Sequence, residues 1–77
     1  MYYYDVVASI CDEFRRRDSH LICGGFNTVE QAIDYINLHD VSEVDYYKYC
    51  RDDETVYIEI ERRHDVDGSF SDIITID

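Results

Sequence analysis

The chain has 77 residues, and its 18 Asp and Glu against seven Lys and Arg give a formal net charge of −11. Such a charge repels nucleic acid and anionic membranes and attracts basic surfaces, so we expect neither direct nucleic-acid binding nor membrane binding. The length predicts one domain over residues 1–77. A hydrophobic fraction of 45 % and an aromatic fraction of 14 % predict a folded domain rather than a disordered acidic tail.

The N-terminal segment favours a β-hairpin. Alternate positions from Tyr2 to Ile10 are apolar, and tyrosine and valine favour strands. A turn over residues 12–18 would pair this strand with residues 20–23. Apolar residues also fall at helical spacing from Tyr3 to Phe14, which leaves open an alternative with two helices on a three-stranded sheet.

The clearest helix runs from Thr28 to Leu38. Asn27 or Thr28 can cap it, with Glu30 or Gln31 completing a capping box. Its apolar residues are spaced to form one buried face: Val29, Ala32, Ile33 and Ile36. Gly24-Gly25 supplies a flexible turn before the helix.

The segment from Val44 to Arg51 is predicted to be a strand that turns back at Asp52-Asp53. In that arrangement Tyr47 and Tyr49 face the core. The outer face then holds Tyr46 and Lys48, near Tyr57 and Glu59. The alternative is a short helix over residues 42–50.

The C-terminal segments predict a hairpin with a definite register. Val56, Ile58 and Ile60 alternate with polar residues, and Phe70, Ile74 and Ile76 are expected to share a face. A loop of residues 66–68 with Gly68 in the left-handed region aligns both apolar sets. The paired residues are then Ile60 with Ile74, Ile58 with Ile76, and Arg62 with Asp72. The predicted fold is α+β, an antiparallel sheet of four to five strands in the order ββαβββ with one helix on a face.

No motif indicates catalysis or a cofactor. Three cysteines, an odd number, predict reduced and largely buried thiols in a cytosolic protein: Cys11, Cys23 and Cys50. No His or Cys pair has the spacing of a zinc site, and Asp65-x-Asp67-Gly68 reads as a turn rather than a calcium loop. The start of the chain lacks signal-peptide character. We therefore expect no enzyme, no metal and no cofactor, and we interpret Arg15-Arg16-Arg17 as a solvated turn.

The acidic residues gather in the second part of the chain. Residues 1–26 have a net charge of −1, and residues 27–77 have −10. Carboxylates interleaved with tyrosines suit arginine-rich surfaces, through ion pairs and cation–π contacts. The predicted partner-binding face consists of Asp40, Glu43, Asp45, Tyr46, Asp52, Asp53, Glu54, Tyr57, Glu59 and Glu61.

In length, charge, tyrosine content and α+β pattern, the chain resembles the small acidic inhibitors that phages encode, notably anti-CRISPR proteins. The resemblance implies a non-enzymatic inhibitor in the cytoplasm of a bacterial host cell. It would occupy the basic, nucleic-acid-binding surface of a CRISPR effector or other defence complex, by acidic mimicry or steric blocking. The residues leave two alternatives: a homodimeric structural or regulatory protein that pairs through a tyrosine-rich strand edge, and a small metal-dependent enzyme.

Overall fold

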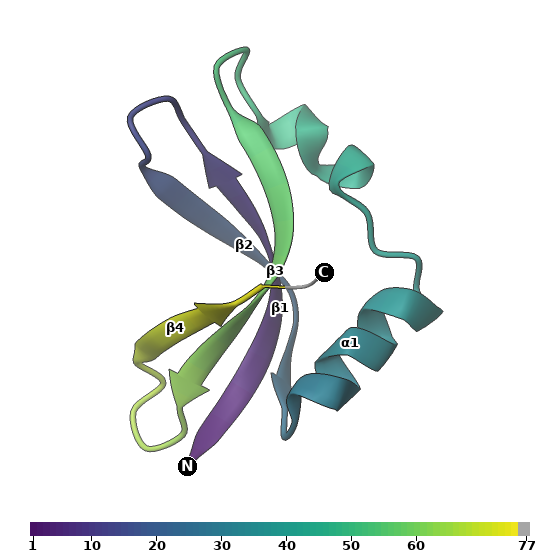
Figure 1. The fold of residues 1–77 in the computed structure, drawn as a ribbon, viewed down its shortest axis with the longest axis vertical. Helices are drawn as coiled ribbons and strands as arrows, with labels where there is room; N and C mark the ends of the chain where they lie inside the picture. The colour runs from purple at the N-terminus through teal and green to yellow at the C-terminus, as the bar shows by residue number, and fades with distance from the viewer. Residues whose placement is uncertain (76–77) are drawn as a thin grey trace.

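Four strands form one antiparallel sheet in the spatial order β2-β1-β3-β4 in the computed structural model, which describes residues 1–75 (Figure 1). The strands are β1 (Tyr2–Cys11), β2 (Arg17–Phe26), β3 (Thr55–His64) and β4 (Phe70–Ile74). The helical elements are α1 (Val29–Leu38) and the 3₁₀ helix η1 (Glu43–Tyr49). The α+β class is confirmed, but the predicted fifth strand is absent from the described residues.

The N-terminal segment is a strand, so the helical alternative for it is wrong. β1 lies between β2 and β3 and pairs with β3 along its whole length, from Tyr2 opposite His64 to Cys11 opposite Thr55. This central position explains why every residue from 5 to 10 is buried, whichever face it points to. Because both faces of β1 are buried, apolar and polar residues do not alternate along it as they do along a half-exposed strand.

The predicted helix and its cap Thr28 are confirmed, but the side chain of Gln31 bonds the amide of the residue before the cap and not that of Thr28, as a capping box would. The Thr28 hydroxyl accepts a hydrogen bond from the Gln31 amide (3.2 Å), and the Gln31 side chain accepts one from the Asn27 amide (3.0 Å). Ala32 has no exposed surface and packs against Val6 and Ile60 of the sheet. This packing holds α1 on one face of the sheet, against β1 and β2.

The segment predicted to be a strand between residues 44 and 51 is η1, so that prediction is wrong. The predicted turn at Asp52-Asp53 would pair such a strand with β3, but both sides of β3 are taken by β1 and β4. Instead the Ser42 hydroxyl caps a 3₁₀ turn by accepting the Val44 amide (3.3 Å). Three residues per turn place Tyr46 against the core, while Tyr47 remains half exposed.

This helical spacing reverses the predicted placement of the tyrosines. Tyr46 packs on Ala8, Ile10 and Val56, on the helix-covered face, and so cannot share an outer face with Tyr57. Tyr47 and Tyr49, which were expected in the core, are 51 % and 52 % exposed.

The register of the C-terminal hairpin is confirmed where the structure describes it. Ile60 lies opposite Ile74, and Arg62 opposite Asp72 with an Nε–Oδ1 distance of 2.8 Å. Gly68 adopts φ of 73°, the left-handed conformation that its turn requires. The expected pairing of Ile58 with Ile76 lies outside the described residues.

Phe70 departs from the prediction for this hairpin. A register shift between Arg62 and Arg63 sets Phe70 opposite Arg63, on the face of the sheet away from Ile74. The extra residue of the bulge inverts the alternation, so Phe70 does not share a face with the isoleucines.

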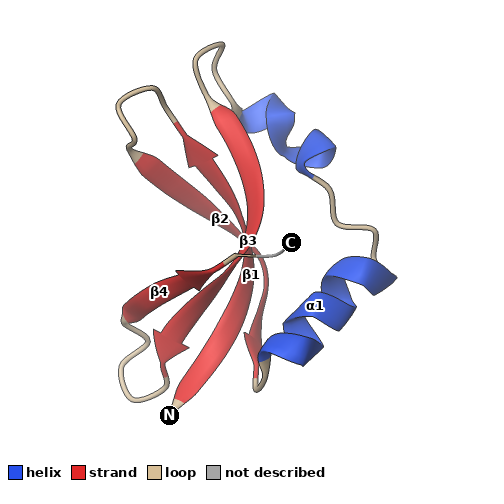
Figure 2. Cartoon of the chain, viewed as in Figure 1, coloured by secondary structure: helices blue, strands red, loops and turns tan. Residues whose placement is uncertain are grey.

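Both helical elements lie on the same side of the sheet, and the other side has no helix over it (Figure 2). We call this second side the open face. α1 covers the core around Val6 and Ile60, and η1 covers the core around Ala8 and Val56. Within residues 1–75, no helix is long and apolar enough to cross a membrane.

Candidate functional sites

The ten predicted partner-binding residues do not form one surface. Asp40 follows α1, and the next three lie on η1: Glu43, Asp45 and Tyr46. The loop before β3 holds Asp52, Asp53 and Glu54. Tyr57, Glu59 and Glu61 lie on β3 and point to the open face, so the sheet separates them from the residues on η1.

The segment of residues 40–54, which we call the acidic segment, carries charge without internal compensation. It holds six carboxylates against one lysine and one arginine, a net charge of −4. None of the six makes an ion pair with any residue that the structure describes. All are exposed except Glu54, whose side chain is half-buried and accepts a hydrogen bond from the Arg51 amide (2.7 Å).

Apolar side chains project from the same segment. Val44 is 72 % exposed, and Tyr47 follows it by one 3₁₀ turn on the same side of η1. Tyr49 stacks on His20 of β2, with ring centroids 5.1 Å apart, and Lys48 lies 5.2 Å from its ring centroid. The acidic segment therefore presents carboxylates beside exposed aromatic and aliphatic groups, a combination that suits a protein partner.

Glu61 is not part of an exposed face, which corrects the prediction for it. Its side chain is 3 % exposed and accepts hydrogen bonds from Arg17 (2.8 Å) and Arg63 (2.9 Å). Burial by itself would raise the pKa of Glu61, but the hydrogen bonds and positive charges of the two arginines outweigh it and lower the pKa. Glu59 is also engaged, at 3.5 Å from Arg17 Nε.

The arginine cluster divides between two roles. Arg16 pairs with Asp12 within the turn (3.1 Å), as the interpretation of a solvated turn expects. The side chain of Arg17 instead extends from β2 across the open face. It donates hydrogen bonds to Ser9 and Glu61, and its guanidinium carbon lies 5.9 Å from the ring centroid of Phe70 on β4. Its long side chain covers part of a sheet face that has no helix, which explains how Ser9 and Glu61 are buried there.

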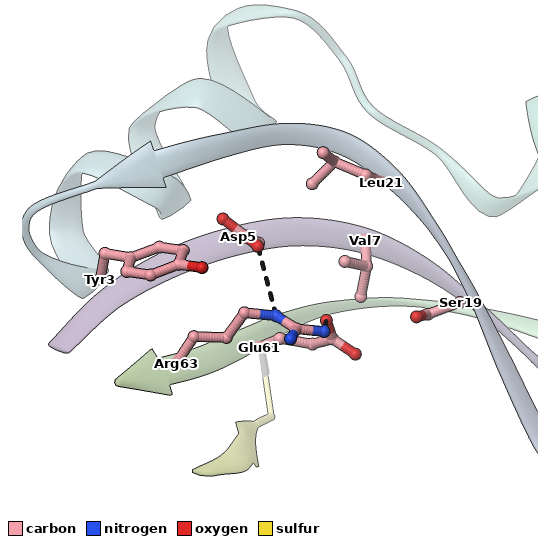
Figure 3. A pocket seen from close by; sticks show the side chains of 7 residues that line it. All are labelled: Tyr3, Asp5, Val7, Ser19, Leu21, Glu61 and Arg63. Carbon is pink, nitrogen blue, oxygen red and sulfur yellow. Dashed lines mark hydrogen bonds and ion pairs between the residues drawn. The ribbon is translucent and has the colours of Figure 1, made fainter. Parts of the chain in front are cut away.

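A pocket of about 310 Å³ lies on the open face beside this network. Figure 3 shows its lining side chains, which come from β1, β2 and β3: Tyr3, Asp5, Val7, Ser19, Leu21, Glu61 and Arg63. Val7 forms an apolar floor, and Leu21 is a 66 % exposed rim residue. The pocket thus joins apolar surface to buried charge.

Arg63 and Asp5 organise the wall of the pocket. Arg63 donates to the Gly68 carbonyl (2.9 Å) and to Glu61, and its Nε lies 3.5 Å from Asp5 Oδ2. The hydrogen bond to Glu61 raises the pKa of Arg63. Asp5 accepts the Gly25 amide at 3.0 Å through its other oxygen. Gly24 makes room for this contact, since a Cβ there would lie 2.5 Å from Asp5 Oδ1.

The candidate metal ligands and nucleophiles of the described residues do not gather in one place. No group of three or more His, Cys, Asp or Glu side chains could hold a metal ion among residues 1–75. The three cysteines are free and half-buried rather than largely buried. Burial and the nearby Glu54 raise the pKa of Cys50, which favours the thiol over the nucleophilic thiolate.

Sequence reasoning missed the open-face pocket: of its lining residues only Glu61 was singled out, and for an exposed face. Asp5 gave one usable signal, a lone carboxylate within an apolar strand, which in a buried setting requires a partner. Its partner Arg63 and the Arg17–Glu61 pair join residues 58 and 44 positions apart, so no local pattern reveals them. Tyr46, Tyr47 and Tyr49 lie on η1 and not on a strand, and pairing of two copies through a strand edge stays a prediction.

Comparison with known proteins yields no relative. No family model, curated protein or solved structure matches the chain.

Proposed function

We propose that this protein is a non-enzymatic, stoichiometric inhibitor that binds a basic protein surface through its acidic segment. The observation that carries the proposal is the set of six carboxylates in residues 40–54 without ion-pair partners among the described residues. By contrast, the arginines at positions 16, 17, 62 and 63, in the β1–β2 turn and the sheet, are all paired with the protein's own carboxylates.

The unpaired charge favours a partner over a purely solubilising role for two reasons. Like charges held close together oppose folding, so an uncompensated cluster costs stability in a small domain. The same segment also exposes Val44 and Tyr47, which solubility does not require. Aromatic groups at the centre of an interface and charges at its rim are the usual composition of a binding surface.

The class of target follows from the charge. Surfaces with a dense positive charge are mostly those that bind nucleic acid, and carboxylates can take the place of phosphates on them. We propose a bacterial defence complex such as a CRISPR effector, in the host cytoplasm, as the resemblance to phage inhibitors implies. Inhibition then consists of displacing the nucleic acid, by mimicry or steric blocking, and needs neither a cofactor nor a catalytic residue.

The experiment titrates the protein against a panel of purified, guide-loaded CRISPR effectors and measures target-DNA binding by mobility shift. We expect one effector to be inhibited near a 1:1 ratio. The variant Asp45→Asn/Asp52→Asn/Asp53→Asn should weaken that inhibition at least about tenfold, because several charge-assisted contacts are lost.

The matched control is Glu13→Gln/Glu30→Gln/Asp34→Asn, which removes the same charge from exposed positions outside the acidic segment. It should stay within about threefold of the unaltered protein, because only long-range steering changes. Equal weakening by both triple variants, or inhibition of no effector in the panel, would contradict the proposal.

A further inference from the structure

We infer that the open-face pocket is a second binding site, which takes a cationic group: the guanidinium or ammonium of an arginine or lysine side chain, or of a small amine. The site is separate from the acidic segment, whose helix η1 lies on the helix-covered side of the sheet and whose loop lies at the start of β3 (Figure 2). It follows from the charges, the hydrogen bonds and the shape of the pocket.

The buried network beside the pocket contains one carboxylate more than it has guanidinium groups. Asp5, Glu59 and Glu61 form a chain of ion pairs with Arg17 and Arg63. One further cation would neutralise this group of five. The net charge of the whole chain, −11, favours a cation and disfavours an anion at the same place.

Asp5 is the carboxylate with the weakest pairing in this network. Its Oδ1 accepts the Gly25 amide, but its Oδ2 has only Arg63 Nε, at 3.5 Å, and accepts no hydrogen bond from residues 1–75. Both oxygens of Glu61, in contrast, accept bonds from arginines at 2.8 and 2.9 Å. Asp5 is 8 % exposed, and the carboxylate lies against the pocket (Figure 3). An N–H donor that enters the pocket therefore finds a carboxylate oxygen to which no described residue donates a hydrogen bond.

The other residues that line the pocket suit the remaining parts of an arginine or lysine side chain. Val7 and Leu21 offer an aliphatic wall for its methylene stem, and the Tyr3 ring is an aromatic neighbour for its charge. A pocket of about 310 Å³ is at the small end of the range for ligand sites, which suits one side chain rather than a large cofactor.

The test uses N-acetyl-L-arginine amide as the cation and N-acetyl-L-citrulline amide as its uncharged isostere. Two-dimensional ¹H–¹⁵N NMR follows the Gly25 amide, which reports on Asp5, during each titration. We expect a saturable shift with the arginine compound, with a Kd of about 1 mM, as suits a single side chain. The citrulline compound should bind at least tenfold more weakly. Spermidine, titrated in the same way, shows whether a small amine is preferred to a side chain.

Two pairs of variants locate the cation. Asp5→Asn should reduce the affinity for the arginine compound at least tenfold, while Asp34→Asn, an exposed acid on α1, should change it less than twofold. Because Asp5→Asn also alters the buried network, Leu21→Lys provides a second route. Its ammonium can enter the pocket from the rim, so it should abolish the Gly25 shift and raise the melting temperature relative to Leu21→Gln. The inference is overturned if arginine and citrulline compounds behave alike, or if the two Leu21 variants do.

Discussion

Glu61 is the residue on which the open face depends most. Its carboxylate is almost fully buried between Arg17 and Arg63, so Glu61→Gln leaves two guanidinium groups facing a neutral amide. Removing one partner of a buried pair costs about 3–5 kcal/mol. The arginine side chains keep 28–29 % exposure, so we expect a smaller loss of roughly 2 kcal/mol in urea denaturation at pH 7. Glu59→Gln, with one longer contact, should lose less than about 1 kcal/mol.

The pH dependence of this loss has a definite sign. The pKa of Glu61 is lower in the folded protein than the ordinary value of 4.5. Its ion pairs therefore contribute their full stability above pH 4.5, and the contribution falls as the pH drops below 4.5 and through the lowered pKa. The difference in unfolding free energy between the protein and Glu61→Gln should be largest at pH 6–7 and shrink toward pH 3. A constant difference would show that Glu61 acts through packing alone.

Gly24 and Gly25 adjoin in sequence but are required for different reasons. Gly24 has Asp5 Oδ1 where a Cβ would lie, whereas Gly25 has open space but a φ of 83°. Gly24→Ala should cost about 1–3 kcal/mol, because Asp5 must move and a buried hydrogen bond is strained. Gly25→Asn should cost less than about 1 kcal/mol, because asparagine tolerates this conformation. Thermal unfolding of the two variants distinguishes the roles, and equal losses would contradict this explanation.

Among the elements, η1 differs most from its prediction, because residues 44–51 were expected to form a strand. Substitutions of its tyrosines distinguish the helix from the strand. Tyr46 packs on Ala8, Ile10 and Val56, so Tyr46→Ala should cost about 2–3 kcal/mol, less than a fully buried aromatic. Tyr47→Ala should change stability by less than about 0.5 kcal/mol, since the side chain is half exposed. A strand with Tyr47 in the core would reverse this order. Chemical denaturation of both variants decides between them.

The elements that were predictable are those whose signals are local. The cap at Thr28, the apolar spacing of α1 and the left-handed Gly68 each arise within a few residues, and each is present. The register of β3 and β4 followed from matching apolar faces, up to the bulge after Arg62 that moves Phe70 to the other face. A bulge adds one residue without changing the composition, so alternation cannot reveal it.

The candidate sites were only half predictable, for a related reason. The acidic segment could be located because its charge is local to residues 40–54. Glu59 and Glu61 were wrongly assigned to the same surface, because no spacing in the sequence shows that they pair with Arg17 of β2, two strands away in the sheet. Tertiary contacts decide whether a carboxylate has an ion-pair partner. The carboxylates of the open-face network have such partners and those of the acidic segment have none among the described residues, a difference that the sequence does not reveal.

At the scale of the whole molecule, paired and unpaired carboxylates should affect stability in opposite directions. The six carboxylates of the acidic segment repel one another and have no ion-pair partner among the described residues. Asp45→Asn/Asp52→Asn/Asp53→Asn should therefore raise the melting temperature at low salt, by roughly 2–5 °C for a domain of this size. Added NaCl screens exposed charges, so it should stabilise the unaltered protein more than the variant. The two melting curves should converge near 0.5 M NaCl, where the Debye length is about 4 Å. Glu61→Gln should stay destabilised over the same range, because its ion pairs are shielded from solvent ions. A triple variant that melts below the unaltered protein at low salt would mean that these carboxylates stabilise the fold, and would contradict their assignment to a basic partner alone.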